Sequence, residues 1–487
     1  MEDRNGMKEK SLKVNMILNS IKGLMSVLFP LISFPYISRV LGVDNVGKYN
    51  FTNSIISYFI LLAGLGIATY AVREGARIRN NKVMLESFVA QVFTINVVST
   101  VFSYIVLFAT ILIIPELHSY KSLLVILSLQ VLFKTLGVDW IYSIYEDFTY
   151  TTIRSIIFQI LSLACMFLFV RTENDVNVYA AITALAAGGS GVINFWHAKR
   201  YCRISLTKKL NLKYHLRPII ILFALAVTVT IYVSSDTTIL GFICGDSSVG
   251  IYSVSVKVYT IVKAVLTYVL MVSIPHLAAA LGAGDEQRFN SVSSELLNTL
   301  ITFVIPATLG LILLRRNIVL SISGAEYIEA ESSLALLSIA LIFGMLSYYW
   351  SQCILINYKK DSLIFKVTAI SAIVNIVLNL IFIPVWKENA AALTTIIAEG
   401  ISCCACWFHG RKYVKLNKVF DTSWKVVLGC IPMAIITIIL RKILTEGIKS
   451  CLLIIAVDVF VYGLLQVFCK NAVVIDILNA IKEKLSK

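Results

Sequence analysis

The chain has 487 residues, of which 58% are hydrophobic and only 15% are charged. Soluble domains carry about 45–50% apolar and about 25% charged residues, so this composition excludes a soluble enzyme and indicates a polytopic membrane protein. The net charge of +15 would suit a nucleic-acid-binding protein. Its distribution along the chain follows membrane topology instead, and no nucleic-acid partner is expected.

Apolar runs long enough to cross roughly 30 Å of hydrocarbon recur along the whole chain. They predict an all-α protein with 14 transmembrane helices, at 15–41, 51–72, 87–114, 121–144, 150–170, 177–198, 217–241, 249–277, 292–314, 332–356, 362–384, 389–410, 421–442 and 448–470. The longest polar stretch, 199–217, has fewer than twenty residues, so no separate soluble domain is expected.

Lysine and arginine concentrate in the loops on one side of the predicted helices, above all at 73–82, 199–217 and 411–425. Because basic loops stay in the cytoplasm, we expect both termini to be cytoplasmic. After the last predicted span, the segment 471–487 places apolar residues at helical spacing opposite charged ones. This pattern predicts an amphipathic helix on the inner leaflet.

Two sequence patterns occur twice, about two hundred residues apart. Leu-Gly, a short turn and then Val-Gly-x-Tyr occur at 41–49 and again at 240–252. More weakly, an aromatic-rich end of an apolar run is followed by a charged exit at 139–147 and at 347–361. A repeat of this period indicates two parallel six-helix halves. The predicted domains are an N-terminal bundle (1–205), a C-terminal bundle (206–416) and a final part with two extra helices and the amphipathic helix (417–487).

Lysines within apolar runs of a duplicated membrane protein point to an anionic passenger. Lys263 lies about fourteen residues into its span, so we expect it to face a transport cavity or to pair with a buried carboxylate. Lys257 lies nearer the outer end and either lines the cavity or reaches out to the interface. Lys22, near the inner end of its span, either lines the cavity or reaches inward to the interface. The three lysines are the candidate substrate-binding residues.

Four other charged residues are candidates for gating and coupling. Arg39 and Asp236 end the first and seventh spans on the outer side, and they either form an ion pair that closes an outer gate or are two solvated helix ends. Glu399 and Asp458 are isolated carboxylates in the twelfth and fourteenth spans. Each is a candidate coupling site for H⁺ or Na⁺.

Other polar groups receive structural interpretations. Lys134 and Asp139, five residues apart, are expected to pair locally or to reach the interface. Cys403, Cys404 and Cys406 lack His or carboxylate partners at ligand spacing and are expected to pack rather than to bind a metal. No phosphate-binding Gly-x4-Gly-Lys-Ser/Thr loop occurs, so no nucleotide cofactor is expected.

The chain resembles the polysaccharide-specific branch of the multidrug/oligosaccharidyl-lipid/polysaccharide (MOP) exporter superfamily, which includes the Wzx-type O-antigen and capsule repeat-unit flippases. The resemblance rests on the arrangement of six, six and two spans and on a series of short motifs. These are 38–42 (Ser-Arg-Val-Leu-Gly) with 46–49 (Val-Gly-Lys-Tyr), 66–68 (Gly-Ile-Ala) leading to Arg73 and Glu74, 138–140 (Val-Asp-Trp) leading to Glu146 and Asp147, and 236–241 (Asp-Thr-Thr-Ile-Leu-Gly) leading to 249–252.

The resemblance implies two pseudo-symmetric bundles around a central cavity, lined by spans 1, 2, 7 and 8 and opening alternately to each side. It implies a bacterial plasma (inner) membrane protein, and a passenger that is an undecaprenyl-pyrophosphate-linked oligosaccharide. A polysaccharide polymerase and other assembly proteins are possible partners. The chain is expected to be a transporter and not an enzyme, with no catalytic residue.

Two other functions remain open. A proton- or sodium-coupled multidrug antiporter of the same superfamily would be expected to have twelve spans and acidic residues in its cavity. A membrane polysaccharide polymerase would need a sizeable catalytic loop or a cluster of acidic residues, His and Arg on one side, and the outer loops are short and poor in such groups.

Overall fold

The computed structural model describes residues 12–271, 273–417 and 419–485, and this part of the chain is helical without any strand. The chain divides into two compact units, Met1–Thr238 and Ile239–Lys487. The boundary between them falls inside the helix α9 (Leu212–Cys244). The division into 1–205, 206–416 and 417–487 stays a prediction.

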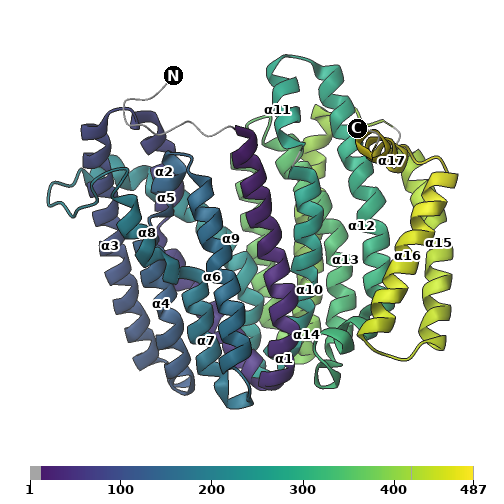
Figure 1. Cartoon of the computed structure of the whole chain (residues 1–487), viewed down its shortest axis with the longest axis horizontal. Coiled ribbons are helices and arrows are strands. Elements are labelled where there is room, and N and C mark those ends of the chain that lie inside the picture. Colours follow the sequence, from purple (N-terminus) through teal and green to yellow (C-terminus); the bar gives the residue numbers. More distant parts are fainter. Residues whose placement is uncertain (1–11, 272, 418, 486–487) are drawn as a thin grey trace. The chain divides into compact units, whose positions relative to one another are not determined.

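The first unit consists of long apolar helices with short connections (Figure 1). Its elements before α9 are α1 (Leu12–Gly64), α2 (Ile67–Ile78), α3 (Lys82–Ile113), η1 (Pro115–Tyr120), α4 (Lys121–Gly137), α5 (Asp139–Ile144), α6 (Phe148–Phe169), η2 (Glu173–Asp175), α7 (Val176–Ala184), η3 (Leu185–Gly189) and α8 (Ser190–Ala198). Asn81 begins α3 by accepting a hydrogen bond from the Met84 N–H (3.1 Å), which is the usual role of asparagine before a helix.

The second unit has the same character. Its elements are α10 (Asp246–Met271), α11 (Ile274–Gly282), α12 (Glu286–Ile322), η4 (Ala325–Tyr327), α13 (Ala330–Tyr348), η5 (Tyr349–Leu355), α14 (Asp361–Gly410), η6 (Arg411–Tyr413), α15 (Val419–Ile443), α16 (Ile448–Phe468) and α17 (Ala472–Leu485). The segments η3 and η5 are π-helical turns, and η1, η2, η4 and η6 are 3-10 turns.

The helices carry apolar side chains on their outer faces as well as in their cores. On α3, Val98, Val101, Phe102 and Ile105 each expose more than half of their surface. They recur at helical spacing, so they form a continuous apolar face that only a lipid environment would cover. The protein is therefore an integral membrane protein.

Twelve segments of the described residues are long and apolar enough to cross a bilayer. Two of them, Val27–Ile78 (52 residues) and Asp361–Tyr413 (53 residues), would each be about 80 Å long at 1.5 Å per residue. Each contains a residue with non-helical backbone angles, Gly42 and Lys387. Each therefore has the length and the break needed for two crossings, as the sequence predicts; the total of fourteen stays a prediction.

The two copies of the Val-Gly-x-Tyr pattern share a backbone feature. Gly42 interrupts α1 with φ 72° and ψ 173°, a conformation accessible essentially to glycine alone. Gly245, between α9 and α10, has φ 81°. Each lies five positions before the glycine of Val-Gly-x-Tyr, Gly47 and Gly250 respectively. The chain turns at equivalent positions in both halves, which supports the predicted duplication.

The second, weaker pair of similar segments, 139–147 and 347–361, also shares a residue with positive φ. Glu146 (φ 56°) and Lys359 (φ 55°) are non-glycine residues in left-handed backbone. In both places the next long helix begins two residues later, α6 at Phe148 and α14 at Asp361. The charged exits at 146–147 and 359–361 are therefore equivalent helix connections.

The helices after the second half pack on α12. Tyr462 of α16 donates a hydrogen bond to the Thr302 carbonyl of α12 (2.8 Å), and Gln466 of α16 donates to the Lys425 carbonyl of α15 (3.0 Å). The predicted helix at 471–487 is present as α17, with Val473 buried and Ile477 and Leu478 exposed. Its position on the inner leaflet stays a prediction.

Candidate functional site

Hydroxyl groups hold α10, α13 and α14 of the second unit together. Ser255 of α10 donates to the Ala330 carbonyl (2.9 Å) and is hydrogen-bonded to Ser333 of α13 (2.7 Å). Ser347 of α13 is hydrogen-bonded to Ser402 of α14 (2.7 Å). Small polar side chains allow helices to approach closely within a membrane. The three helices therefore form a compact frame around the charged residues that lie between these two contacts.

A buried ion pair lies within this frame. The Lys263 ammonium of α10 donates a hydrogen bond to Glu399 Oε1 of α14 (2.7 Å). It also donates to the Tyr259 hydroxyl (2.9 Å), which in turn donates to the same carboxylate oxygen (3.3 Å). The Glu399 side chain is 7% exposed and that of Lys263 is 29% exposed. Of the two alternatives for Lys263, the structure contains the pairing with a buried carboxylate.

Gly344 of α13 forms the third wall of the pair. A Cβ atom at this position would lie 3.0 Å from Lys263 Nζ and 3.0 Å from Glu399 Oε1. Only glycine leaves this space to the ammonium and the carboxylate. The ion pair is thus built from one residue on each of α10 and α14 and from the absence of a side chain on α13.

The Gly344→Ala variant is expected to separate the pair and to lose about 1–3 kcal/mol of unfolding free energy, because the added methyl overpacks a filled site. Gly400→Ala in α14 is the matched control, since a Cβ there meets no atom within 4 Å. The control should be neutral or stabilising by up to about 1 kcal/mol. Denaturant titration of both variants in detergent micelles measures the difference, and equal stabilities would contradict the tight contact at Gly344.

The ion pair joins a predicted substrate-binding residue to a predicted coupling residue. Lys263 and Glu399 are 136 positions apart in the sequence, and the packing of α10 against α14 brings them together. The pair carries no net charge while both groups are ionised. An anion that reaches Lys263 must compete with the carboxylate, and protonation of Glu399 would leave the ammonium without its counter-charge.

The other predicted site residues are dispersed. The side chain of Lys22 lies outside the described residues, although its backbone belongs to α1. Lys257 is half-buried in α10, Arg39 is exposed in α1 and Asp236 is buried in α9. The gate formed by Arg39 and Asp236 stays a prediction, as does substrate binding by Lys22 and Lys257.

Asp458 lies between α15 and α16, apart from the frame that holds Glu399. It is 5% exposed, and its Oδ2 accepts a hydrogen bond from Thr437 (2.8 Å). Its Oδ1 has no hydrogen-bond partner among the described residues. A role for Asp458 in coupling stays a prediction.

Sequence reasoning missed two members of the site. Of the two alternatives for Lys134 and Asp139, the local pair is not the one that the structure contains. The Tyr259 hydroxyl binds both charges of the ion pair. Its spacing of four residues from Lys263 is the available sequence signal. Gly344 has no sequence signal. Asp139 bonds to Arg154 and Asn194, not locally to Lys134, because Val138 (φ 40°) ends α4 and breaks the helix that the five-residue spacing assumed.

The long apolar helices and the buried ion pair define a polytopic helical membrane protein with charge inside its second unit, an arrangement typical of transporters. A family model described as polysaccharide biosynthesis protein matches residues 12–281. The chain belongs to this family. This confirms the resemblance seen in the sequence.

One curated relative and two solved structures extend the comparison. The chain is 23% identical over 395 residues, covering 80% of this chain and 94% of the relative, to a protein of Escherichia coli (strain K12) named "Putative O-antigen transporter". Its fold is similar to that of the lipid II flippase MurJ in an inward closed conformation, with a TM-score of 0.76 and 18% identity over 94% of this chain and 100% of MurJ.

The fold is also similar to an inward-facing multidrug resistance MATE transporter of the MOP superfamily, with a TM-score of 0.62 and 13% identity. That match covers 82% of this chain and 97% of the MATE chain. At these identities the two structures establish the common fold alone.

Proposed function

We propose that the protein is a flippase that moves undecaprenyl-pyrophosphate-linked oligosaccharide repeat units from the cytoplasmic to the outer leaflet of a bacterial inner membrane. It works by alternating access, with both termini in the cytoplasm, and serves the synthesis of a cell-surface polysaccharide. It acts as a transporter and not as an enzyme. The family membership and the name of the E. coli relative support the substrate class. The observation that carries the mechanism is the Lys263–Glu399 pair.

The physical problem of this transport is the headgroup. A pyrophosphate with hydroxyl-rich sugars cannot leave water unaided, because each unpaired polar group costs several kcal/mol in an apolar medium. A lysine ammonium in the protein lowers that barrier by pairing with a phosphate oxygen. Lys22 and Lys257 are the further candidates for such contacts.

The pairing of Lys263 with Glu399 gives this contact a switch. In the substrate-free state the carboxylate holds the ammonium. A proton taken up by Glu399 releases the ammonium, which then binds a phosphate of the passenger; loss of that proton restores the internal pair and displaces the phosphate. Coupling of proton movement to substrate exchange follows from the competition for one ammonium group. Binding of sodium instead of a proton at Glu399 is the alternative, and a transport assay with a sodium gradient would reveal it.

The test is transbilayer movement of a fluorescent undecaprenyl-pyrophosphate oligosaccharide in proteoliposomes, with and without a pH gradient. We expect wild-type movement to depend on the gradient and Lys263→Gln to reduce the rate at least about tenfold, since it removes one charge-assisted hydrogen bond to phosphate. Lys449→Gln, at an exposed lysine near the start of α16, is the matched control and should retain the wild-type rate.

The other outcomes separate the parts of the proposal. Movement that is unaffected by Lys263→Gln would keep the flippase and exclude Lys263 as its phosphate contact. A requirement for a sodium gradient would replace the proton as the coupling ion. If the lipid does not move but a cationic dye is exchanged for protons or sodium, the protein is a multidrug antiporter and the proposed function is wrong.

A further inference from the structure

A cavity of about 110 Å³, partly open to the surroundings, lies in the first unit between α4, α5, α6, α8 and the π-helical turn η3. Its polar lining among the described residues includes Gln130, Lys134, Asp139, Arg154 and Asn194. None of these residues belongs to the predicted substrate, gate or coupling sets. The cavity is therefore separate from the Lys263–Glu399 pair of the second unit.

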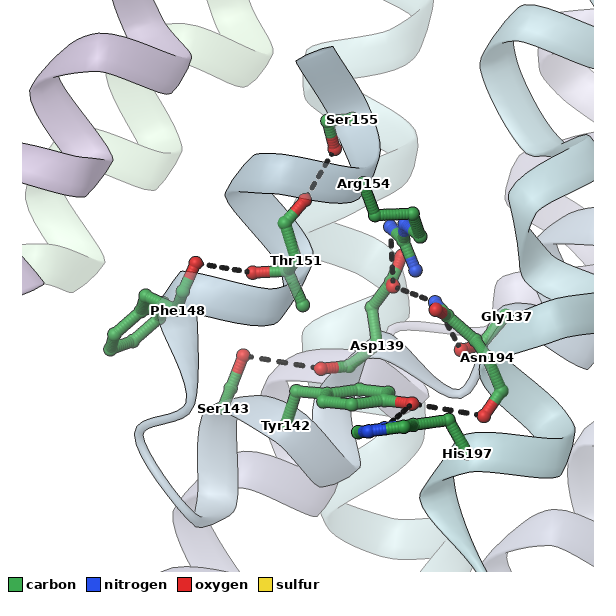
Figure 2. A network of polar contacts seen from close by, with 10 residues as sticks. All are labelled: Gly137, Asp139, Tyr142, Ser143, Phe148, Thr151, Arg154, Ser155, Asn194 and His197. Carbon is green, nitrogen blue, oxygen red and sulfur yellow. Dashed lines mark hydrogen bonds and ion pairs between the residues drawn. The ribbon is translucent and has the colours of Figure 1, made fainter. Parts of the chain in front are cut away.

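Close glycine contacts form the walls of this cavity. A Cβ on Gly191 would lie 2.5 Å from the Phe133 carbonyl oxygen, and a Cβ on Gly188 would lie 2.4 Å from the Phe133 Cβ. The backbones of α8 and η3 thus touch α4 directly. Asp139 and Asn194, which also line the cavity, are hydrogen-bonded to each other (Figure 2).

Arg154 reaches into the cavity from α6, and its side chain is only 11% exposed. Its one ion pair is a long contact from Nη2 to Asp139 Oδ1 (3.4 Å). Its Nε and Nη1 are buried and have no hydrogen-bond partner in the described part of the chain. Buried N–H groups of a guanidinium are costly to leave without an acceptor. Their donors call for a ligand or ordered water in the adjacent space.

Asp139 does not supply an acceptor for the Nε and Nη1 groups of Arg154. Its Oδ1 is shared, because it also accepts a 2.8 Å hydrogen bond from Asn194 Nδ2, as Figure 2 shows. The same Asn194 group donates to the Gly137 carbonyl (3.0 Å). Asn194 Oδ1 is buried and has no partner among the described residues. The cavity therefore presents two guanidinium donors and one amide acceptor.

The charges and the volume limit what can bind there. Lys134 and Arg154 bring two positive charges to the lining and Asp139 brings one negative charge. The N–H groups of a guanidinium are strong hydrogen-bond donors to the oxygens of a carboxylate or phosphate. A volume of about 110 Å³ is ample for a small oxyanion, since a single water needs only about 10–15 Å³ by this kind of measure.

We propose that this cavity binds one tetrahedral oxyanion of the phosphate class, either free phosphate or the phosphoryl group of a lipid headgroup. Arg154 donates to one of its oxygens through a buried N–H group, Lys134 adds charge at the rim, and Asn194 Oδ1 accepts the hydrogen of a protonated phosphate oxygen. The site is independent of the proposed transport function, so its test uses binding and not transport.

The experiment follows thermal unfolding of the full-length protein in phosphate-free detergent by intrinsic tryptophan fluorescence. Inorganic phosphate is titrated against sodium chloride at equal ionic strength, and short-chain phosphatidic acid is titrated in parallel. We expect phosphate to raise Tm by about 2–4 °C at a hundredfold excess over Kd. Arg154→Gln should weaken binding at least about tenfold, because it removes a charge-assisted hydrogen bond to the oxyanion.

Three further variants make the result specific. Arg171→Gln, at the exposed arginine after the other end of α6, is the matched control and should bind phosphate as the wild type does. Arg154→Lys keeps the charge but loses the planar guanidinium that places the donor at a fixed position, so it should also bind weakly. Lys134→Gln, at an exposed side chain, should fold normally and weaken phosphate binding severalfold. It tests the site if the Arg154 variants do not fold.

Each outcome decides the proposal. A rise with phosphate that is lost in Arg154→Gln supports a free-ion site, and a response to phosphatidic acid at tenfold lower concentration supports a lipid phosphoryl group. A Tm that no phosphate compound raises means that the cavity holds water only. An equal rise in wild type and in the Arg154 or Lys134 variants places the binding elsewhere. Either of the last two results overturns the site.

Discussion

Replacing Glu399 by alanine is expected to destabilise the protein by about 2–4 kcal/mol, because it leaves the Lys263 ammonium largely buried without its counter-charge. The lower part of the usual range for buried pairs is appropriate, since the Lys263 side chain is 29% exposed and solvent screens part of its charge. Denaturant titration in detergent micelles measures the change in unfolding free energy.

The double change Lys263→Met with Glu399→Leu is the internal control. It removes both charges, so it should cost less than Glu399→Ala alone, and the double-mutant cycle should give a coupling energy of at least about 1 kcal/mol. Additive effects would mean that the two residues do not interact in the folded protein. The same double variant should lose substrate movement if the ammonium is the phosphate contact, which separates stability from function.

Replacing Gly191 by alanine is expected to cost about 3 kcal/mol or more, at the upper end of overpacking effects. The reason is that the new Cβ would meet backbone rather than a movable side chain: the Phe133 carbonyl oxygen at 2.5 Å and the Gly137 Cα and N at 3.1 Å. To accept it, α8 would have to move away from α4. Loss of folded protein after detergent extraction and a lower unfolding free energy are the readouts.

Gly463→Ala in α16 is the matched control for Gly191→Ala. A Cβ at Gly463 meets no atom within 4 Å, and alanine is a better helix former than glycine by roughly 1 kcal/mol. The control should therefore be as stable as the wild type or more stable. If Gly191→Ala were equally stable, the contact between α4 and α8 would be looser than described. The oxyanion cavity would then have no rigid wall at this place.

Much of the architecture follows from the sequence by itself. A bilayer demands helices whose backbone groups are satisfied internally, so apolar runs of sufficient length identify them without knowledge of the fold. The repeated Val-Gly-x-Tyr pattern predicted a duplicated chain, and the left-handed glycines Gly42 and Gly245 occupy equivalent places in it. Lys263 was recognisable as a candidate site residue because an ammonium deep in a span needs a partner or a cavity.

Only the tertiary structure decided which partner that is. Lys263 and Glu399 are 136 positions apart, and no pattern along one helix tells which face of another it will meet. The role of Gly344 is equally invisible in a sequence, since it consists of space left for two other side chains. A local pair of Asp139 with Lys134 was one of two alternatives from their spacing, but the helix break at Val138 places Asp139 against Arg154 and Asn194. Local pattern determines the helices, whereas contacts between distant helices depend on packing that only the folded chain defines.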